Sequence, residues 1–420
     1  MKQQVFTIIS IIIVWFTTCQ LHSQINLDSC QAGARRNYPL IRQYDLIEQT
    51  EEFTISNAGK AYLPQLSFNI IGGIIDGLPS FNVPGSDSGS NSDFQLISTV
   101  QVNQAIWDGG WTRASKKIAT ARSEIEKAHV DLALYQIRER INNLYFGILL
   151  MDAQIDQQRI FLENLERNEK RVKIAIENGT AYRSDLDEIK VSSLNAEERI
   201  VELEHTKSAY GKVLSLMIGE PINEEDEFMR PQIEFEDFEN HINRPELYKF
   251  DSQKELVDAR AAMNRSALYP RIGILGFGTF LTPGINFGPD KIDRVLVAGL
   301  NVSWDIGGLY RNSNQKNLEE IELKNIQNQE DTFIFNTKLQ LGQKEIEIQK
   351  FQQLIEKNKE VLMIRQRIRE AYEVKYENGV CTMTELLDKT NEENLASQKL
   401  ILQEILYLQK VYEYKYSSGN

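Results

Sequence analysis

Glu177-Asn178-Gly179, followed by Ser184-Asp185-Leu186, returns later in the chain as Glu377-Asn378-Gly379, followed by Thr384-Glu385-Leu386. The two glycines are 200 residues apart (379 − 179), and no gap interrupts the match. A repeat of this length indicates two similar halves rather than a solenoid of short modules. The fold is therefore expected to be pseudo-symmetric, with two similar halves side by side.

A second pair of matching segments lies upstream, where Trp107-Asp108-Gly109-Gly110 returns as Trp304-Asp305-Ile306-Gly307-Gly308. Both copies have the same order: a β-like segment, Trp-Asp-Gly, a long polar helix, an Asn-Gly turn and a second helix. The whole unit is therefore predicted to be duplicated, and not the turn alone.

The bulk composition excludes several classes of function. The chain has 420 residues, a formal net charge of −13 and a pI near 5.1, and it lacks the basic patch of a nucleic-acid binder. Its four histidines are scattered, so we expect no metal site and no cofactor. Gly276-Phe277-Gly278 lacks the third glycine of a dinucleotide fingerprint. Carboxylate pairs such as Glu197-Glu198 occur in charged helices and are interpreted as surface groups, so no enzyme is expected.

Residues 1–23 have the pattern of a secretory signal peptide. Lys2 precedes an apolar run from Val5 to Phe16, and the preferred cleavage site follows Ser23. The run is shorter than the ~20 residues of a membrane helix, and no other segment is apolar enough, so any membrane span would use strands. Lipidation of Cys19 is an alternative, although Phe16-Thr17-Thr18 lacks the small residue usual before a lipidated cysteine.

Cleavage would leave two cysteines, Cys30 and Cys381, in unlike sequence contexts. This pair gives no disulfide framework. Both are interpreted as packing residues, and a reactive thiol is the alternative.

Two β-hairpins are predicted, at about 64–107 and about 270–305. Pro64 and Pro270 open them, and Gly- and Pro-rich loops are expected at 77–93 and about 283–290. Val100 and Val102 fall on one face of their strand and Gln101 on the other, and residues 295–304 alternate in the same way. Such alternation suits a transmembrane barrel strand, and a soluble sandwich with tryptophans in its core is the alternative. In the barrel, an interfacial aromatic belt would consist of Trp107, Trp111, Trp304 and Tyr310.

Two helical hairpins are predicted, at about 110–218 and about 309–415. Their first helices lack proline as far as Asn178 and Asn378, and each of ~68 residues would extend on the order of 100 Å. Helices this long and polar need coiled-coil partners. Gly179 and Gly379 are expected to end them in the left-handed conformation. Ser184 and Thr384 are expected to cap the returning helices.

Two further segments complete the assignment. Residues about 24–60 are predicted to form a short helix that ends near Gly59. Residues 219–243 are acidic, contain Pro221 and Pro231, and are predicted to be an irregular connector.

This ordered set of features resembles the TolC-like outer-membrane efflux protein family over nearly the whole mature chain. The segments that carry the resemblance are Leu27-Asp28-Ser29-Cys30, Asn37-Tyr38-Pro39, Leu63-Pro64, Tyr269-Pro270, Asn178-Gly179 through Asp185-Leu186, and Asn378-Gly379 through Glu385-Leu386-Leu387-Asp388. The resemblance implies an α+β membrane protein with one repeat at 24–218 and a second at 244–420.

The family fold implies a homotrimer. Each protomer would add four strands to a shared twelve-stranded β-barrel and its helical hairpins to an α-helical barrel across the periplasm. Four strands cannot close a barrel alone, and open edges in lipid are forbidden. The implied function is an exit duct in the outer membrane of a Gram-negative bacterium. Its partners would be outer-membrane lipid, a periplasmic adaptor and an inner-membrane pump, either proton-driven or of the ABC type.

The resemblance also assigns roles at the two Asn-Gly tips. Asn178, Gly179, Asn378 and Gly379 would dock the adaptor. Glu385 and Asp388 would ring a cation-attracting entrance, although first-turn acids that offset the helix dipole are the alternative.

Asp185 and Tyr376 match positions that help hold the entrance closed in the family. The family's basic residue two positions after the second tip glycine is replaced here by Cys381, and Arg183 is a candidate for the missing charge.

A periplasmic adaptor with coiled-coil hairpins is the main alternative function. An adaptor would need a single hairpin flanked by lipoyl-like domains, so the duplicated hairpin argues against it. Cargo stays open, because efflux ducts, type I secretion ducts and metal-export ducts share one architecture.

Overall fold

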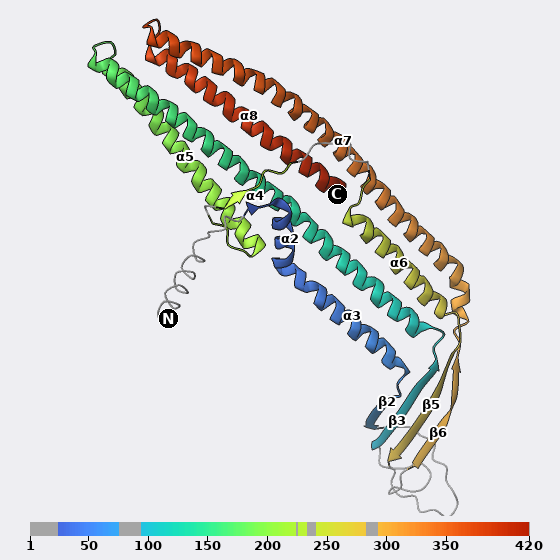
Figure 1. Ribbon diagram of the computed structural model, residues 1–420. Helices are drawn as coiled ribbons and strands as arrows, with labels where there is room; N and C mark the ends of the chain where they lie inside the picture. The colour runs from blue at the N-terminus through green and yellow to red at the C-terminus, as the bar shows by residue number, and fades with distance from the viewer. Residues whose placement is uncertain (1–23, 75–93, 224–225, 233–240, 283–292, 420) are drawn as a thin grey trace, which may run out of the picture. The chain divides into compact units, whose positions relative to one another are not determined.

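The computed structural model describes residues 24–74, 94–223, 226–232, 241–282 and 293–419 (Figure 1). The predicted signal peptide and both predicted Gly- and Pro-rich loops lie outside these residues. The helices and strands, in chain order, are β1 (Gln24–Ile25), α2 (Leu27–Asn37), α3 (Gln43–Gly59), β2 (Gln65–Ile74), β3 (Phe94–Trp107), α4 (Trp111–Glu177), α5 (Arg183–Ile218), β4 (Glu227–Phe228), α6 (Pro245–Ser266), β5 (Arg271–Thr282), β6 (Asp293–Ser303), α7 (Gly307–Glu377) and α8 (Met383–Ser418).

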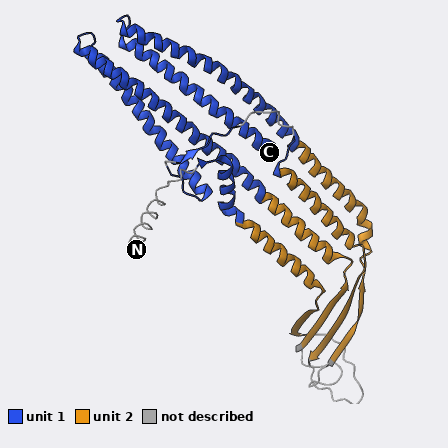
Figure 2. Cartoon of the chain, in the orientation of Figure 1, with its two compact units in different colours: residues 1–41, 130–245, 333–420 blue, residues 42–129, 246–332 orange. Residues whose placement is uncertain are grey.

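The chain divides into two compact units (Figure 2). Unit 1 comprises residues 1–41, 130–245 and 333–420, and unit 2 comprises residues 42–129 and 246–332. Each unit takes segments from both predicted repeats, and α4 and α7 each contribute to both units. The compact units therefore do not coincide with the repeats, and the division into repeats stays a prediction.

Unit 2 contains one four-stranded antiparallel sheet in the order β2-β3-β5-β6. The strands begin after Pro64 and Pro270, as the sequence predicts. Register along β3 and β5 shifts between Ala105 and Trp107. Near this irregularity a Cβ on Gly273 would lie 2.8 Å from the carbonyl oxygen of Gln104, so only glycine fits there.

The first Trp-Asp-Gly segment leads into α4, and Asp108 stabilises the start of that helix. Its carboxylate accepts hydrogen bonds from the amides of Gly110 (2.9 Å) and Thr112 (2.8 Å) and from the Tyr62 hydroxyl (2.8 Å). Burial acts to raise the pKa of Asp108, but these hydrogen bonds outweigh it and lower the pKa overall. The negative charge is therefore stable beside the N-terminus of α4.

The second Trp-Asp-Gly segment has a different backbone conformation and different aspartate contacts. Gly109 and Gly110 have positive φ, whereas Gly307 and Gly308 are already helical residues of α7. Asp305 forms an ion pair with Arg311 (3.4 Å) rather than the hydrogen bonds that Asp108 accepts. Matching sequence therefore does not give matching local structure.

Unit 1 has a core built by α2, α4, α5 and α8. Its fully buried side chains include Tyr145, Phe146 and Leu214. Cys30 is a buried free cysteine of this core, and burial raises the pKa of its thiol to about 11, so the thiol stays protonated. This agrees with the predicted packing role.

The predicted connector is not wholly irregular. Within its described residues, β4 pairs in parallel with β1 at the start of the chain. The Tyr145 hydroxyl lies 2.8 Å from the Ile25 carbonyl and 2.6 Å from the Met229 carbonyl and ties both segments to α4.

Two helix assignments need correction. The single helix expected at about 24–60 is two helices, because Pro39 has no N–H to continue α2 and its ring excludes the preceding turn. The exit near Gly59 is confirmed. Helix α6 was not predicted from the sequence, although Pro245 at its first position is a start signal.

Candidate functional site at the helix-hairpin tips

The two Asn-Gly turns connect α4 to α5 and α7 to α8 and lie at the same end of unit 1 (Figure 1). Gly179 has φ +73° and Gly379 has φ +68°, as the predicted left-handed caps require. In each turn the glycine amide donates a hydrogen bond to the carbonyl three residues before it. The amide of the next residue donates to the carbonyl five residues before it, which belongs to Ala175 in the first turn (2.8 Å) and to Lys375 in the second (2.8 Å). Both helices therefore end in a Schellman motif, and the two tips have the same pattern of backbone hydrogen bonds.

The predicted caps of the returning helices are wrong. Ser184 and Thr384 are already inside α5 and α8, and the N-cap positions are Tyr182 and Thr382. Asp185 accepts a hydrogen bond from the Tyr182 amide (3.0 Å). An acid three residues after the cap closes a capping box, and this fixes the cap two residues earlier than predicted.

Glu385 is the acid of the second capping box. Its carboxylate accepts hydrogen bonds from the amide (2.8 Å) and hydroxyl (3.1 Å) of Thr382, and its own amide donates to the Thr382 hydroxyl (3.3 Å). These bonds hold the pKa of Glu385 below its ordinary value. Asp388 is exposed, and no described residue pairs with its carboxylate. The two predicted entrance acids therefore have different local roles.

Tyr376 and Asp185 come from different hairpins and are brought together within one protomer. Tyr376 packs against an apolar cluster to which α4, α5, α7 and α8 all contribute, with Leu165, Ile189 and Leu386 at its centre. Burial raises the pKa of the Tyr376 hydroxyl, and the charge of Asp185 raises it further. The hydroxyl thus stays protonated beside the carboxylate.

Cys381, which replaces the family's basic residue, is a half-buried free cysteine. Its thiol donates to the carbonyl of Tyr372 (3.5 Å), and burial followed by the charge of Glu385 raises its pKa. Arg183, the candidate for the missing charge, begins α5 and is exposed. Two lysines supply positive charge near this tip: the ammonium groups of Lys375 and Lys389 lie 4.4 Å and 5.8 Å from the centre of the Tyr372 ring.

Polar contacts that the sequence analysis missed connect the two hairpins. Arg171 of α4 pairs with Glu373 (3.5 Å) and Glu377 (3.6 Å) of α7, and the Thr384 hydroxyl donates to Glu188 of α5 (2.7 Å). Exposed pairs of this kind contribute roughly 0–1 kcal/mol each. Opposite charges within eight residues of the two tip glycines mark Arg171, Glu373 and Glu377 as candidates, but they do not show which of them pair across the hairpins.

The sheet of unit 2 offers a second surface of interest. Its register aligns apolar side chains of all four strands on one face, here called the apolar sheet face: Leu66, Phe68, Ile70, Val100, Val102, Ile272, Ile274, Leu296, Leu300 and Val302. The opposite face is mixed, with Ser67, Gln101 and Asn301 beside Phe277 and Val297. Most side chains of the apolar face are exposed, so nothing within unit 2 covers it.

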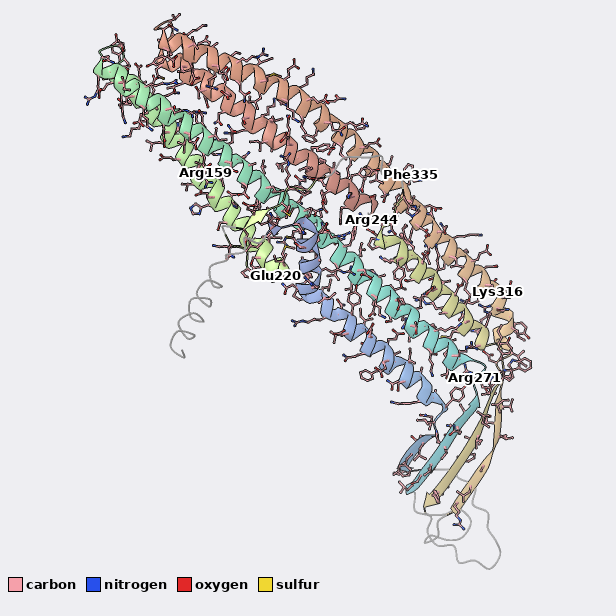
Figure 3. The ribbon with its side chains drawn as sticks, viewed as in Figure 1. Arg159, Glu220, Arg244, Arg271, Lys316 and Phe335 are labelled. Atoms are coloured by element: carbon pink, nitrogen blue, oxygen red, sulfur yellow. The ribbon has the colours of Figure 1, made fainter. Side chains whose placement is uncertain are left out.

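Aromatic side chains gather where the sheet meets the helices. Trp107 contacts Tyr269 edge to face (6.2 Å), and the Trp304 indole N–H donates to the Leu268 carbonyl (3.0 Å). The Arg271 guanidinium, labelled in Figure 3, lies 5.1 Å from the centre of the Trp111 ring. Of the four predicted belt residues, all are exposed, and Tyr310 most so.

No described helix is both long and apolar enough to cross a membrane. Among the described residues, no group of three or more His, Cys, Asp or Glu side chains is placed to hold a metal ion.

Comparison with solved structures identifies the fold. The outer membrane protein VceC of Vibrio cholerae matches with a TM-score of 0.66 and 13% identity, over 94% of this chain and 96% of VceC. CusC, whose structures concern transmembrane channel formation, matches with a TM-score of 0.68 and 13% identity, over 96% of each chain. The open-state MtrE outer membrane channel of Neisseria gonorrhoeae matches with a TM-score of 0.65 and 14% identity, over 94% of this chain and 89% of MtrE.

This chain has the fold of the TolC-like outer-membrane channels. The resemblance drawn from the sequence is confirmed at the level of fold. No protein-family model and no curated protein matches the sequence. At 13–14% identity the likeness establishes the fold alone, so the role of this TolC-like chain is proposed from its own residues.

Proposed function

We propose that this chain is the outer-membrane exit duct of a tripartite efflux or type I secretion system, extending from the outer membrane into the periplasm of a Gram-negative bacterium. The observation that carries the proposal is the TolC-like fold over 94% of the chain, found together with an uncovered apolar sheet face. Transport through it is passive, and the pump supplies the energy.

The duct is a homotrimer. The sheet of one protomer has four strands and ends at β2 and β6, whose outer edges have no described partner. Unpaired backbone groups in hydrocarbon cost several kcal/mol each, so the sheet needs further strands to enter lipid. Three copies supply a closed twelve-stranded barrel, and their apolar sheet faces contact lipid.

The tips form the periplasmic entrance and dock an adaptor that joins the duct to an inner-membrane pump. Asn178-Gly179 and Asn378-Gly379 present two similar loops per protomer, and Glu385 and Asp388 bring six carboxylates together in a trimer. Tyr376 and Asp185, with the Arg171 and Thr384 contacts, hold the two hairpins of a protomer together in the closed entrance. The adaptor alternative calls for one hairpin and lipoyl-like domains, whereas the described residues contain two hairpins and one four-stranded antiparallel sheet.

The proposal is tested by deleting the gene in the source bacterium and measuring export of dyes, drugs, metal ions and secreted proteins. We expect at least one class to accumulate inside, with normal export restored by the wild-type gene. Restored export of small molecules alone indicates efflux, and restored export of a protein alone indicates type I secretion. Unchanged export of every class, together with absence of the protein from outer-membrane fractions, would contradict the proposal.

A further inference from the structure

A cleft of about 660 Å³ opens in unit 1, apart from the residues of the tips and of the sheet. It is lined by the first turn of α2, the middle of α4, the residues after β4 and the last turns of α8. Its volume falls within the ~300–1,000 Å³ typical of small-molecule sites.

Positive charge dominates the lining of this cleft. Arg138, Arg230 and Lys415 line it, and Asp28 is the only carboxylate among the described lining residues. Arg230 pairs with Glu404 (3.2 Å). Arg138 is half-buried, lies 5.4 Å from the centre of the Tyr135 ring, and has no carboxylate partner among the described residues. Arg138 therefore presents to the cleft a positive charge that no described carboxylate neutralises.

A buried amide adds hydrogen-bond donors beside Arg138. Asn142 follows Arg138 by one helical turn on α4, so both side chains lie on the same face of the helix. The Asn142 side chain is 4% exposed, and its oxygen accepts a hydrogen bond from the Gln31 amide (2.6 Å). The Asn142 amide nitrogen is then left to donate, and no described residue accepts from it. The wall therefore presents donors that lack acceptors.

An aromatic wall completes the cleft. Tyr412 and Tyr416 are one turn apart on α8 and line it together. Tyr416 is held by stacking on Tyr135, with ring centres 4.7 Å apart, and Arg244 (Figure 3) donates to the Tyr416 carbonyl (3.2 Å). Burial raises the pKa of the Tyr412 hydroxyl, which stays a neutral donor. The rings give a ligand a fixed apolar surface.

We propose that this cleft binds a small organic anion, whose carboxylate pairs with Arg138 and Asn142 and whose apolar body lies against Tyr412 and Tyr416. A carboxylate matches the planar guanidinium with two parallel hydrogen bonds, which a lysine cannot reproduce. Inorganic anions would satisfy the donors but leave the tyrosine wall unused. The inference is independent of the export role, because the cleft uses neither the tips nor the sheet.

The test is isothermal titration of the purified full-length protein in detergent. The probes are 2-naphthoate, the neutral analogue 2-naphthalenemethanol, and inorganic phosphate. We expect 2-naphthoate to bind and both other probes to bind at least about tenfold more weakly. Arg138→Gln is expected to weaken 2-naphthoate binding at least about tenfold, and Arg138→Lys several-fold, because the lysine keeps the charge but loses the paired geometry.

The matched control is Arg140→Gln, which removes an exposed arginine from the same helix and is expected to bind like the wild type. Thermal unfolding of each variant checks that the fold is intact. If Arg138→Gln fails to fold, the Arg138→Lys series decides. The proposal is overturned if 2-naphthoate does not bind the wild type, if the alcohol or phosphate binds equally well, or if neither Arg138 variant weakens binding.

Discussion

Glu385 and Asp388 are three residues apart near the start of α8, yet their carboxylates are available to different extents. The Glu385 carboxylate is held by Thr382, whereas that of Asp388 is exposed and has no partner among the described residues. A tethered charge still contributes to the local potential, but it cannot turn toward a passing ion. Asp388 is therefore the better candidate for the charge that an ion meets at the entrance.

We predict that Asp388→Asn lowers the cation selectivity of the reconstituted channel about twofold or more, and that Glu385→Gln lowers it less. Reversal potentials across a lipid bilayer with a KCl gradient measure this directly. Because hydrogen bonds depress the pKa of Glu385, its charge persists as pH falls to 4.5 and is lost only below that value. Its contribution to stability has the same sign: present above pH 4.5 and lost as pH falls through the lowered pKa. Selectivity that survives in Asp388→Asn but vanishes in Glu385→Gln would reverse this assignment of roles.

At the scale of helices and strands, the sequence predicted where the helices of the two hairpins turn back better than where the returning helices begin. Gly179 and Gly379 mark helix ends because a left-handed residue is needed there and glycine alone adopts it without strain. Helix starts were harder, because Thr382 and Thr384 both have a hydroxyl that can accept from a backbone amide. The signal that identifies Thr382 as the cap is the acid Glu385 three residues after it. The contacts of Arg171 with α7 could not be predicted, because they depend on how two hairpins pack and not on either hairpin alone.

The corrected cap gives a test with a built-in control. Thr382→Ala removes the hydroxyl that caps α8 and is expected to cost about 1 kcal/mol locally, so the amides of the first turn should exchange hydrogen about fivefold faster. Thr384→Ala removes only the bond to Glu188 and is expected to leave exchange of the Glu385 amide unchanged. Hydrogen exchange followed by mass spectrometry on the peptides around 382–390 compares the two variants. Faster exchange in Thr384→Ala alone would restore the cap originally predicted from the sequence.

At the scale of the whole molecule, the predicted duplication accounts for the order of elements but not for the compact units. Each compact unit draws on both predicted repeats, because the long helices α4 and α7 each contribute to both units. The sequence could predict the alternation of β6, since period 2 is a local property. Which face meets lipid depends on the register of all four strands, in which Leu300 opposes Ile274 and Asn301 opposes Gly273.

Leu300 and Asn301 are therefore the matched pair that tests the membrane assignment. Leu300 is 76% exposed on the apolar sheet face, and it lies four residues from Trp304, about 13 Å along the strand. With the usual strand tilt this places it near the middle of a hydrocarbon band about 25 Å tall. An arginine there should cost about 2–4 kcal/mol, whereas Asn301→Arg puts the same charge on the opposite face, which in the proposed barrel is turned toward the lumen.

We expect Leu300→Arg to reduce the amount of heat-resistant trimer in outer-membrane fractions severalfold, and Asn301→Arg to leave it near the wild-type level. Gel electrophoresis with and without boiling measures both. Equal assembly of the two variants would mean that the apolar sheet face does not contact lipid. The reverse order would mean that the sheet is inserted with its mixed face outward, and the proposed barrel would then be wrong even though the fold is right.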